Sequence, residues 1–159
     1  MRVFVFGYGA LGEHAGTPVR LRGFRRAWNV AMDNRETISG YKCYLDEAGS
    51  RPEVYVTFLN LVEGPGVDGV AIRVDDFAPL DARERNYARV DVTDAVDADL
   101  GAPVYAYLGR DEAVARFEAG HRGGRAVVAR AYLDGVRAAF PGLAPPQLPV
   151  HDLTRIDLP

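Results

Sequence analysis

The stretch Val3-Phe-Val-Phe-Gly-Tyr-Gly-Ala-Leu-Gly12 decides how this chain begins to fold. Its first four residues are β-branched or aromatic, which predicts a short buried strand. The residues from Gly7 to Gly12 then match the G-x-G-x-x-G spacing of a dinucleotide-binding turn. Such a site needs a helix whose first amides face the pyrophosphate, but Gly16 and Pro18 would break a helix within its second turn. We therefore expect an irregular glycine loop that binds a carboxylate or oxyanion and no dinucleotide.

The composition is that of an ordinary globular protein. The 159 residues are 48% apolar and 26% charged, which predicts a single domain over residues 1–159, with a core at about 1–140 and a proline-rich tail at 141–159. The net charge is −3 without a basic stripe, so no nucleic-acid partner is expected. The chain offers neither a membrane-spanning apolar run nor a signal peptide, which favours a cytoplasmic protein.

Two single residues add to this interpretation. Cys43 is the only cysteine, which fits a reducing compartment, and a small buried apolar role is favoured over that of a nucleophile. Lys42 is the only lysine among many arginines, a bias that hints at a bacterial source.

The remaining pattern predicts an α+β fold of about six or seven strands and about three helices. Many strands joined by short turns favour a curled or closed sheet over a doubly wound one. After the first strand, strands are expected over 19–32 with a break near Gly23, and over 38–45, 54–62, 70–74, 88–92 and 104–108. Helices are expected from Asp75 or Asp76 to about Asn86, from Asp111 to about Ala119, and from Arg125 to Phe140.

The first of these helices carries an acidic residue on its apolar face. Glu84 follows Phe77 by seven residues and Leu80 by four, so all three share one side of a helix. A carboxylate directed toward a core is costly unless it is paired or used in chemistry. Glu84 is therefore either a functional acid or base, or the partner of an arginine such as Arg25 or Arg26.

Other polar residues give weaker signals. Tyr87 lies three positions after Glu84 and either contacts the same site or anchors the helix end. The loop from Gly120 to Arg125 either holds an anion or is a flexible turn between helices. The three histidines lack metal-ligand spacing, so no metal site is expected; they are His14, His121 and His151.

Two of these motifs together resemble the γ-glutamylcyclotransferase-like family, its ChaC-like branch included. They are the loop Phe6-Gly-Tyr-Gly-Ala-Leu11 after the first strand and the later Leu80-Asp-Ala-Arg-Glu84 with Tyr87. The segments 21–26 and 67–74 are also similar to the family. The resemblance implies a small mixed β-barrel flanked by helices, without a cofactor. It also implies an enzyme that cyclises a γ-glutamyl group to 5-oxoproline and releases the attached amine or amino acid, as in glutathione metabolism.

Carried over residue by residue, the resemblance implies a catalytic acid/base at Glu84 and a substrate contact at Tyr87. The substrate-binding loop would be formed by Tyr8, Gly9, Ala10 and Leu11. Ala10 stands where the family usually has serine, so the loop keeps its backbone amides but lacks a hydroxyl.

Three other interpretations remain open from the sequence. The chain could be a non-catalytic relative that binds γ-glutamyl ligands, a nucleotide-binding oxidoreductase, or a tailoring enzyme that removes γ-glutamyl from a natural product. The partner expected in the main interpretation is a small γ-glutamyl molecule. Its leaving group and the oligomeric state of the protein stay undetermined.

Overall fold

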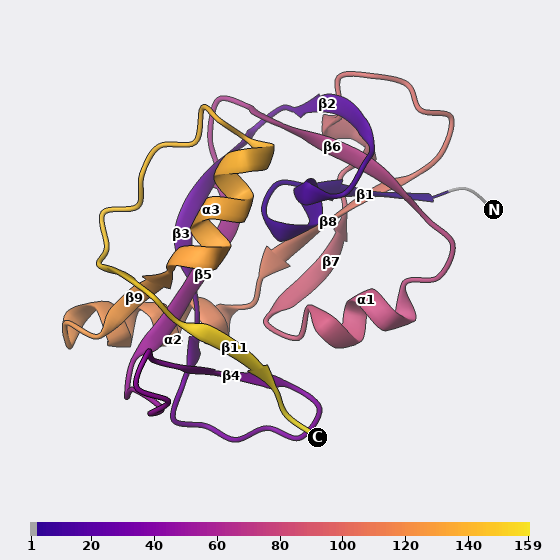
Figure 1. The fold of residues 1–159 in the computed structure, drawn as a ribbon. Helices are drawn as coiled ribbons and strands as arrows, with labels where there is room; N and C mark the ends of the chain where they lie inside the picture. Colours follow the sequence, from indigo (N-terminus) through magenta and orange to yellow (C-terminus); the bar gives the residue numbers. More distant parts are fainter. Residues whose placement is uncertain (1–2) are drawn as a thin grey trace.

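The computed structural model describes residues 3–159 and has an α+β architecture of three sheets and a few helices (Figure 1). The first sheet has the order β2 (Thr17–Leu21), β6 (Val67–Val74), β1 (Val3–Gly7), β8 (Val104–Gly109) and β7 (Tyr87–Asp91). The second has the order β10 (Val150–His151), β9 (Ala126–Ala129), β5 (Tyr55–Glu63) and β3 (Phe24–Asp33). The third pairs β11 (Thr154–Asp157) with β4 (Lys42–Leu45).

Three α-helices and two short 3-10 helices complete the described part of the chain. They are η1 (Ala10–Glu13), α1 (Ala78–Arg83), η2 (Thr93–Ala95), α2 (Asp111–Arg122) and α3 (Arg130–Ala139). The α+β class predicted from the sequence is confirmed. The expected closed barrel is not found within residues 3–159, where the strands form separate sheets, and they number eleven instead of six or seven.

A bent two-stranded ribbon joins the two larger sheets. One side of it is β2 followed by β3, and the other is β5 followed by β6. The predicted break near Gly23 is confirmed: Gly23 has φ +82° and Gly66, on the other side, has φ +137°. Glycine adopts such angles without the steric cost of a Cβ, so the ribbon bends here from one sheet into the next.

The glycine loop after β1 does not begin an α-helix. It forms only the four-residue η1, in which the Gly12 amide donates to the Gly9 carbonyl at 2.9 Å, and β2 follows from Thr17. The sequence therefore predicted correctly that the G-x-G-x-x-G motif lacks the helix of a dinucleotide site.

Two expected helices need correction. The helix expected from Asp75 or Asp76 to Asn86 is limited to α1, because Glu84 leaves helical geometry at ψ 47°. The segment expected to continue as a helix from Arg125 begins as a strand. Residues 126–129 are all buried, and this strand pairs in parallel with β5 through residues 126 and 127 and with β10 through residues 128 and 129. A short apolar run cannot be assigned to helix or strand by its periodicity alone. The proline-rich tail also contributes two strands, β10 and β11.

One edge of β5 holds the two larger sheets together. β9 pairs with β5 only at Tyr55 and Val56, so the later backbone groups on that side need other partners. The buried side chain of Asn60 supplies one of them, because its Oδ1 accepts from the Leu61 amide at 2.8 Å. The same oxygen accepts from the amide of Gly109, on β8 of the other sheet, also at 2.8 Å.

We expect Asn60→Ala to lower the free energy of unfolding by about 2–4 kcal/mol, because two buried amides lose their acceptor. Urea denaturation measures this loss. The matched control is Thr57→Val on the same strand, whose buried hydroxyl has no partner among residues 3–159. That exchange should be close to neutral, and an equally small effect at Asn60 would contradict its role as the link between sheets.

Candidate active site

A pocket of about 390 Å³ opens beside the glycine loop, between the first sheet and the β4–β11 pair. Six of the eight tyrosines line it, so its walls combine aromatic surface with phenolic hydroxyls. All the site residues expected from the sequence lie on its wall, namely Tyr8, Gly9, Ala10, Leu11, Glu84 and Tyr87. The fold thus gathers two motifs that are more than seventy residues apart in the chain.

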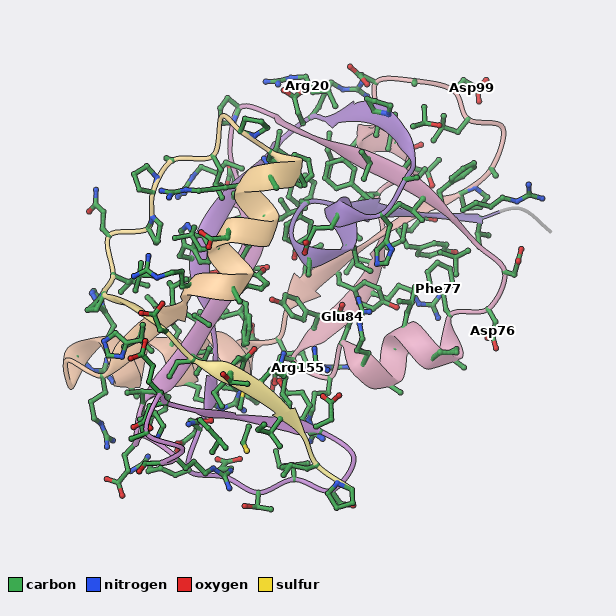
Figure 2. The ribbon with its side chains drawn as sticks, viewed as in Figure 1. Arg20, Asp76, Phe77, Glu84, Asp99 and Arg155 are labelled. Carbon is green, nitrogen blue, oxygen red and sulfur yellow. The ribbon has the colours of Figure 1, made fainter. Side chains whose placement is uncertain are left out.

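Glu84 lies directly after the last turn of α1 and not within the helix. Its amide donates to the Leu80 carbonyl at 2.8 Å, and its side chain is 18% exposed. As predicted, Phe77 and Leu80 on the same side pack against the core. Figure 2 shows Glu84 near the middle of the molecule, at the opposite end of α1 from Phe77.

The sequence suggested Arg25 or Arg26 as a partner for Glu84, but in the structure its partner is a different arginine. Arg83 approaches the carboxylate, with 3.3 Å between Nη2 and Oε1. Arg26 instead donates from Nε to the Tyr8 carbonyl at 2.8 Å and from Nη2 to the Asp68 carbonyl at 2.7 Å. Because the Arg83 side chain is about half-exposed, this ion pair is weak and leaves Glu84 available at the pocket wall.

The loop residue Tyr8 is held from two sides. Its backbone carbonyl accepts from Arg26, while its buried hydroxyl donates to the Tyr107 carbonyl. The Tyr107 hydroxyl donates in turn to Asp81 at 2.7 Å, and Asp81 forms an ion pair with Arg89. This chain of contacts fixes the start of the glycine loop against β8 and α1.

Close packing explains the glycines of the loop. A Cβ on Gly7 would lie 2.8 Å from the Gly12 amide nitrogen, and one on Gly12 would lie 2.4 Å from the Phe140 ring. A Cβ on Gly9 would come within 3.0 Å of the Tyr132 hydroxyl. The bare backbone therefore brings the loop close to α3 and the pocket.

The hydroxyls of Tyr87 and Tyr132 bind the backbone of Leu59 on the unpaired edge of β5. Tyr87 donates to the Leu59 carbonyl at 2.7 Å, and the Leu59 amide donates to the Tyr132 hydroxyl at 3.2 Å. Tyr87 thus lines the pocket with its ring while its hydroxyl serves the fold. The contact of Tyr87 with a substrate stays a prediction, and it would be made by the ring because the hydroxyl is bonded to Leu59.

The phenols of the pocket stay protonated near neutral pH. Burial raises the pKa of Tyr8, Tyr87 and Tyr132, and the charge of Glu84 adds to the shift in each. Burial also raises the pKa of Tyr44 to about 12. A phenolate is therefore not available as a proton acceptor in this pocket near neutral pH, whereas the carboxylate of Glu84 lies on its wall.

Sequence reasoning did not place several residues that line the pocket. Lys42 and Tyr44 come from β4, Phe58 from β5 and Arg155 from β11, and no local motif marks them. The sequence shows that Lys42 is the only lysine, but it does not indicate that this lysine lies in the pocket. The remaining lining residues outside the two motifs are Glu13, His14, Tyr41, Leu59, Asn86, Tyr107 and Tyr132.

Other residues considered for chemistry lie elsewhere. Cys43 is buried, at 4% exposure, as a small apolar residue would be. Helix α2 continues through Gly120 to Arg122, and Gly124 makes the turn that follows with φ +69°.

In the part of the chain that the structure describes, no three His, Cys, Asp or Glu side chains gather as a metal site. None of the helices between residues 3 and 159 has the length and apolar character needed to cross a bilayer.

We expect Tyr87→Phe to lower the free energy of unfolding by about 1–2 kcal/mol, since it removes the hydrogen bond to the Leu59 carbonyl. Thermal or urea unfolding measures the change. Tyr105→Phe is the control, because the Tyr105 hydroxyl makes no hydrogen bond within residues 3–159, and the contacts of its ring with Phe77 and Arg89 are kept by phenylalanine. Equal stabilities of the two variants would argue against the role assigned to the Tyr87 hydroxyl.

Comparisons with known proteins complete the description. No family model and no curated protein matches this sequence. Among solved structures, the chain is similar to one described as "Gamma-glutamyl cyclotransferase", with a TM-score of 0.46 and 13% sequence identity. The alignment covers 92% of this chain and 90% of that one.

Proposed function

We propose that this protein is a γ-glutamylcyclotransferase-like enzyme that cyclises a γ-glutamyl group to 5-oxoproline and releases the attached amine. The observation that carries the proposal is the position of Glu84, an 18% exposed carboxylate on the wall of a pocket whose phenols stay protonated. The loop Tyr8–Leu11 lies on the same wall. These are the two elements that the sequence resemblance assigns to the reaction.

The reaction asks little of the protein beyond proton transfer and positioning. The α-nitrogen of the substrate attacks its own γ-carbonyl carbon, so nucleophile and electrophile are already tethered. The bond between that carbon and the leaving nitrogen then breaks. With the substrate in its free-amine form, Glu84 accepts the proton lost by the attacking nitrogen and returns it to the leaving nitrogen.

The glycine loop is suited to the charge that develops on the carbonyl oxygen. Ala10 and Leu11 begin the short helix η1, so their amides have no partner from a preceding turn of helix. Preorganised amides that face an oxyanion or the substrate's α-carboxylate lower a barrier by several kcal/mol. The volume of about 390 Å³ suits a small molecule of dipeptide size.

We expect Glu84→Gln to lower kcat by about a hundredfold or more while substrate binding changes little, because glutamine keeps the shape but cannot carry the proton. Release of 5-oxoproline from a panel of γ-glutamyl amines, γ-glutamyl dipeptides and glutathione measures turnover. Calorimetric titration of the same compounds measures binding.

The control for this variant is Glu118→Gln, which removes an exposed carboxylate of α2 outside the pocket. It should keep the activity of the unmodified protein. Near-normal turnover in Glu84→Gln would refute the proposed mechanism. Binding of γ-glutamyl compounds without any turnover by the unmodified protein would instead identify a non-catalytic relative.

Ala10 tests whether the loop acts through its backbone. Ala10→Ser adds only a hydroxyl at an exposed position, so the fold should tolerate it. One additional hydrogen bond in the transition state would raise kcat/KM on small γ-glutamyl dipeptides by up to roughly tenfold. Loss of activity on every substrate by a folded variant would show that the size of residue 10, and not the backbone, is what the site requires.

A further inference from the structure

The only lysine of the chain lies on the wall of this pocket. Lys42 begins β4 and is partly buried, and its Nζ lies 4.3 Å from the centre of the Phe58 ring. The rings of Tyr41 and Tyr44 follow at 5.5 and 5.9 Å. Among the residues from 3 to 159, no ion pair includes this ammonium group. Aromatic faces attract a cation but do not replace an anionic partner.

The other charges of the pocket leave Lys42 free to bind an anion. Glu84 lies on the same wall, but within residues 3–159 its ion pair is with Arg83, so no carboxylate lies within ion-pair distance of the Lys42 ammonium. Arg155, which β11 places beside β4, holds Asp157 at 2.9 Å and remains half-exposed. An anion at this end of the pocket would therefore meet the ammonium of Lys42, with the guanidinium of Arg155 at the rim.

This cationic end lies across the pocket from the glycine loop. In Figure 1, β4 and β11 run along the lower part of the molecule, while the turn after β1, drawn in indigo, lies above them. Figure 2 places Arg155 on the β11 side of Glu84. A γ-glutamyl group whose oxygens face the loop would thus direct its leaving group past Glu84 toward Lys42.

We propose that Lys42 and Arg155 form a carboxylate-binding subsite that selects γ-glutamyl substrates whose released amine carries a carboxylate. This inference rests on the proposed function and deepens it, because the sequence left dipeptides and simple amines as equal candidates. A charged hydrogen bond to a carboxylate in a partly desolvated site contributes about a ten- to hundredfold factor in affinity.

The subsite should lose its charge in mildly alkaline solution. Burial is the main cause that lowers the pKa of Lys42 to about 8, and the positive charge of Arg155 contributes. The ammonium is present below that pH and is lost above it, so binding of a carboxylate weakens as the pH rises through 8. The charged and titratable groups around Lys42 are Tyr41, Tyr44, Arg83, Glu84, Arg155 and Asp157.

The test compares γ-glutamylalanine with γ-glutamylethylamide, which differ only by the carboxylate of the leaving amine. The unmodified protein should favour γ-glutamylalanine in kcat/KM. Lys42→Met, which keeps an unbranched apolar chain against the rings, should lose about ten- to a hundredfold on γ-glutamylalanine and less than about threefold on the ethylamide. Arg130→Gln, at a surface ion pair outside the pocket, is the control and should change neither value.

The pH profile of the unmodified protein tests the same assignment without a variant. The ratio of the two kcat/KM values should fall by about tenfold between pH 7 and pH 9, since kcat/KM follows the free enzyme's ionisation. Titration of the substrate's own α-amine is common to both compounds and cancels in the ratio. A flat ratio would overturn the subsite, as would an equal loss on both substrates in Lys42→Met.

A binding measurement separates this inference from the proposed function. Reductive methylation with ¹³C-formaldehyde gives a single dimethyllysine signal, separate from that of the N-terminal α-amine, because Lys42 is the only lysine. That signal should shift with γ-glutamylalanine much more than with γ-glutamylethylamide, whether or not either compound is turned over. Absence of 5-oxoproline from both compounds would refute the proposed function alone, whereas equal shifts would refute the subsite alone.

Discussion

The unpaired edge of β5 is the constraint on which the rest of this structure depends. Beyond Val56 no strand within residues 3–159 pairs with this edge, yet its amides and carbonyls lie inside the protein and need partners. The Asn60 side chain accepts a hydrogen bond from the Gly109 amide of β8. The hydroxyls of Tyr87 and Tyr132 form hydrogen bonds with the backbone of Leu59. Three separate elements are therefore held at one short stretch of strand, and the pocket forms where they meet.

This arrangement divides the pocket residues into two kinds. Three hydroxyls donate hydrogen bonds to protein acceptors, those of Tyr8, Tyr87 and Tyr107. Burial raises the pKa of each, so these hydroxyls stay protonated. They shape the wall and fix the glycine loop. Within residues 3–159, Glu84 and Lys42 carry charged groups on the pocket wall that have no buried ion-pair partner, so we assign chemistry to Glu84 and recognition to Lys42. Rigid walls around a few free charges are what a specific small-molecule site requires.

The candidate site could be predicted in part from the sequence, because its main elements are local motifs. Glycines after a buried strand marked the loop, and the spacing from Phe77 and Leu80 marked Glu84. The same spacing overestimated the helix, since it extends past the point where Glu84 leaves helical geometry. Lys42 and Arg155 carried no such mark, because their meeting depends on the pairing of β4 with β11 across more than a hundred residues.

The sequence by itself determined the short-range features: the strand Val3–Gly7, the absence of a helix after it, the bend at Gly23 and the polar residue at the end of α1. Each depends on side chains within a few residues, where periodicity and glycine geometry act directly. Only the tertiary structure decided that residues 126–129 form a strand beside β5 and that the tail closes the pocket through β11. Those choices depend on backbone hydrogen bonds and burial supplied by distant segments, which no local pattern contains.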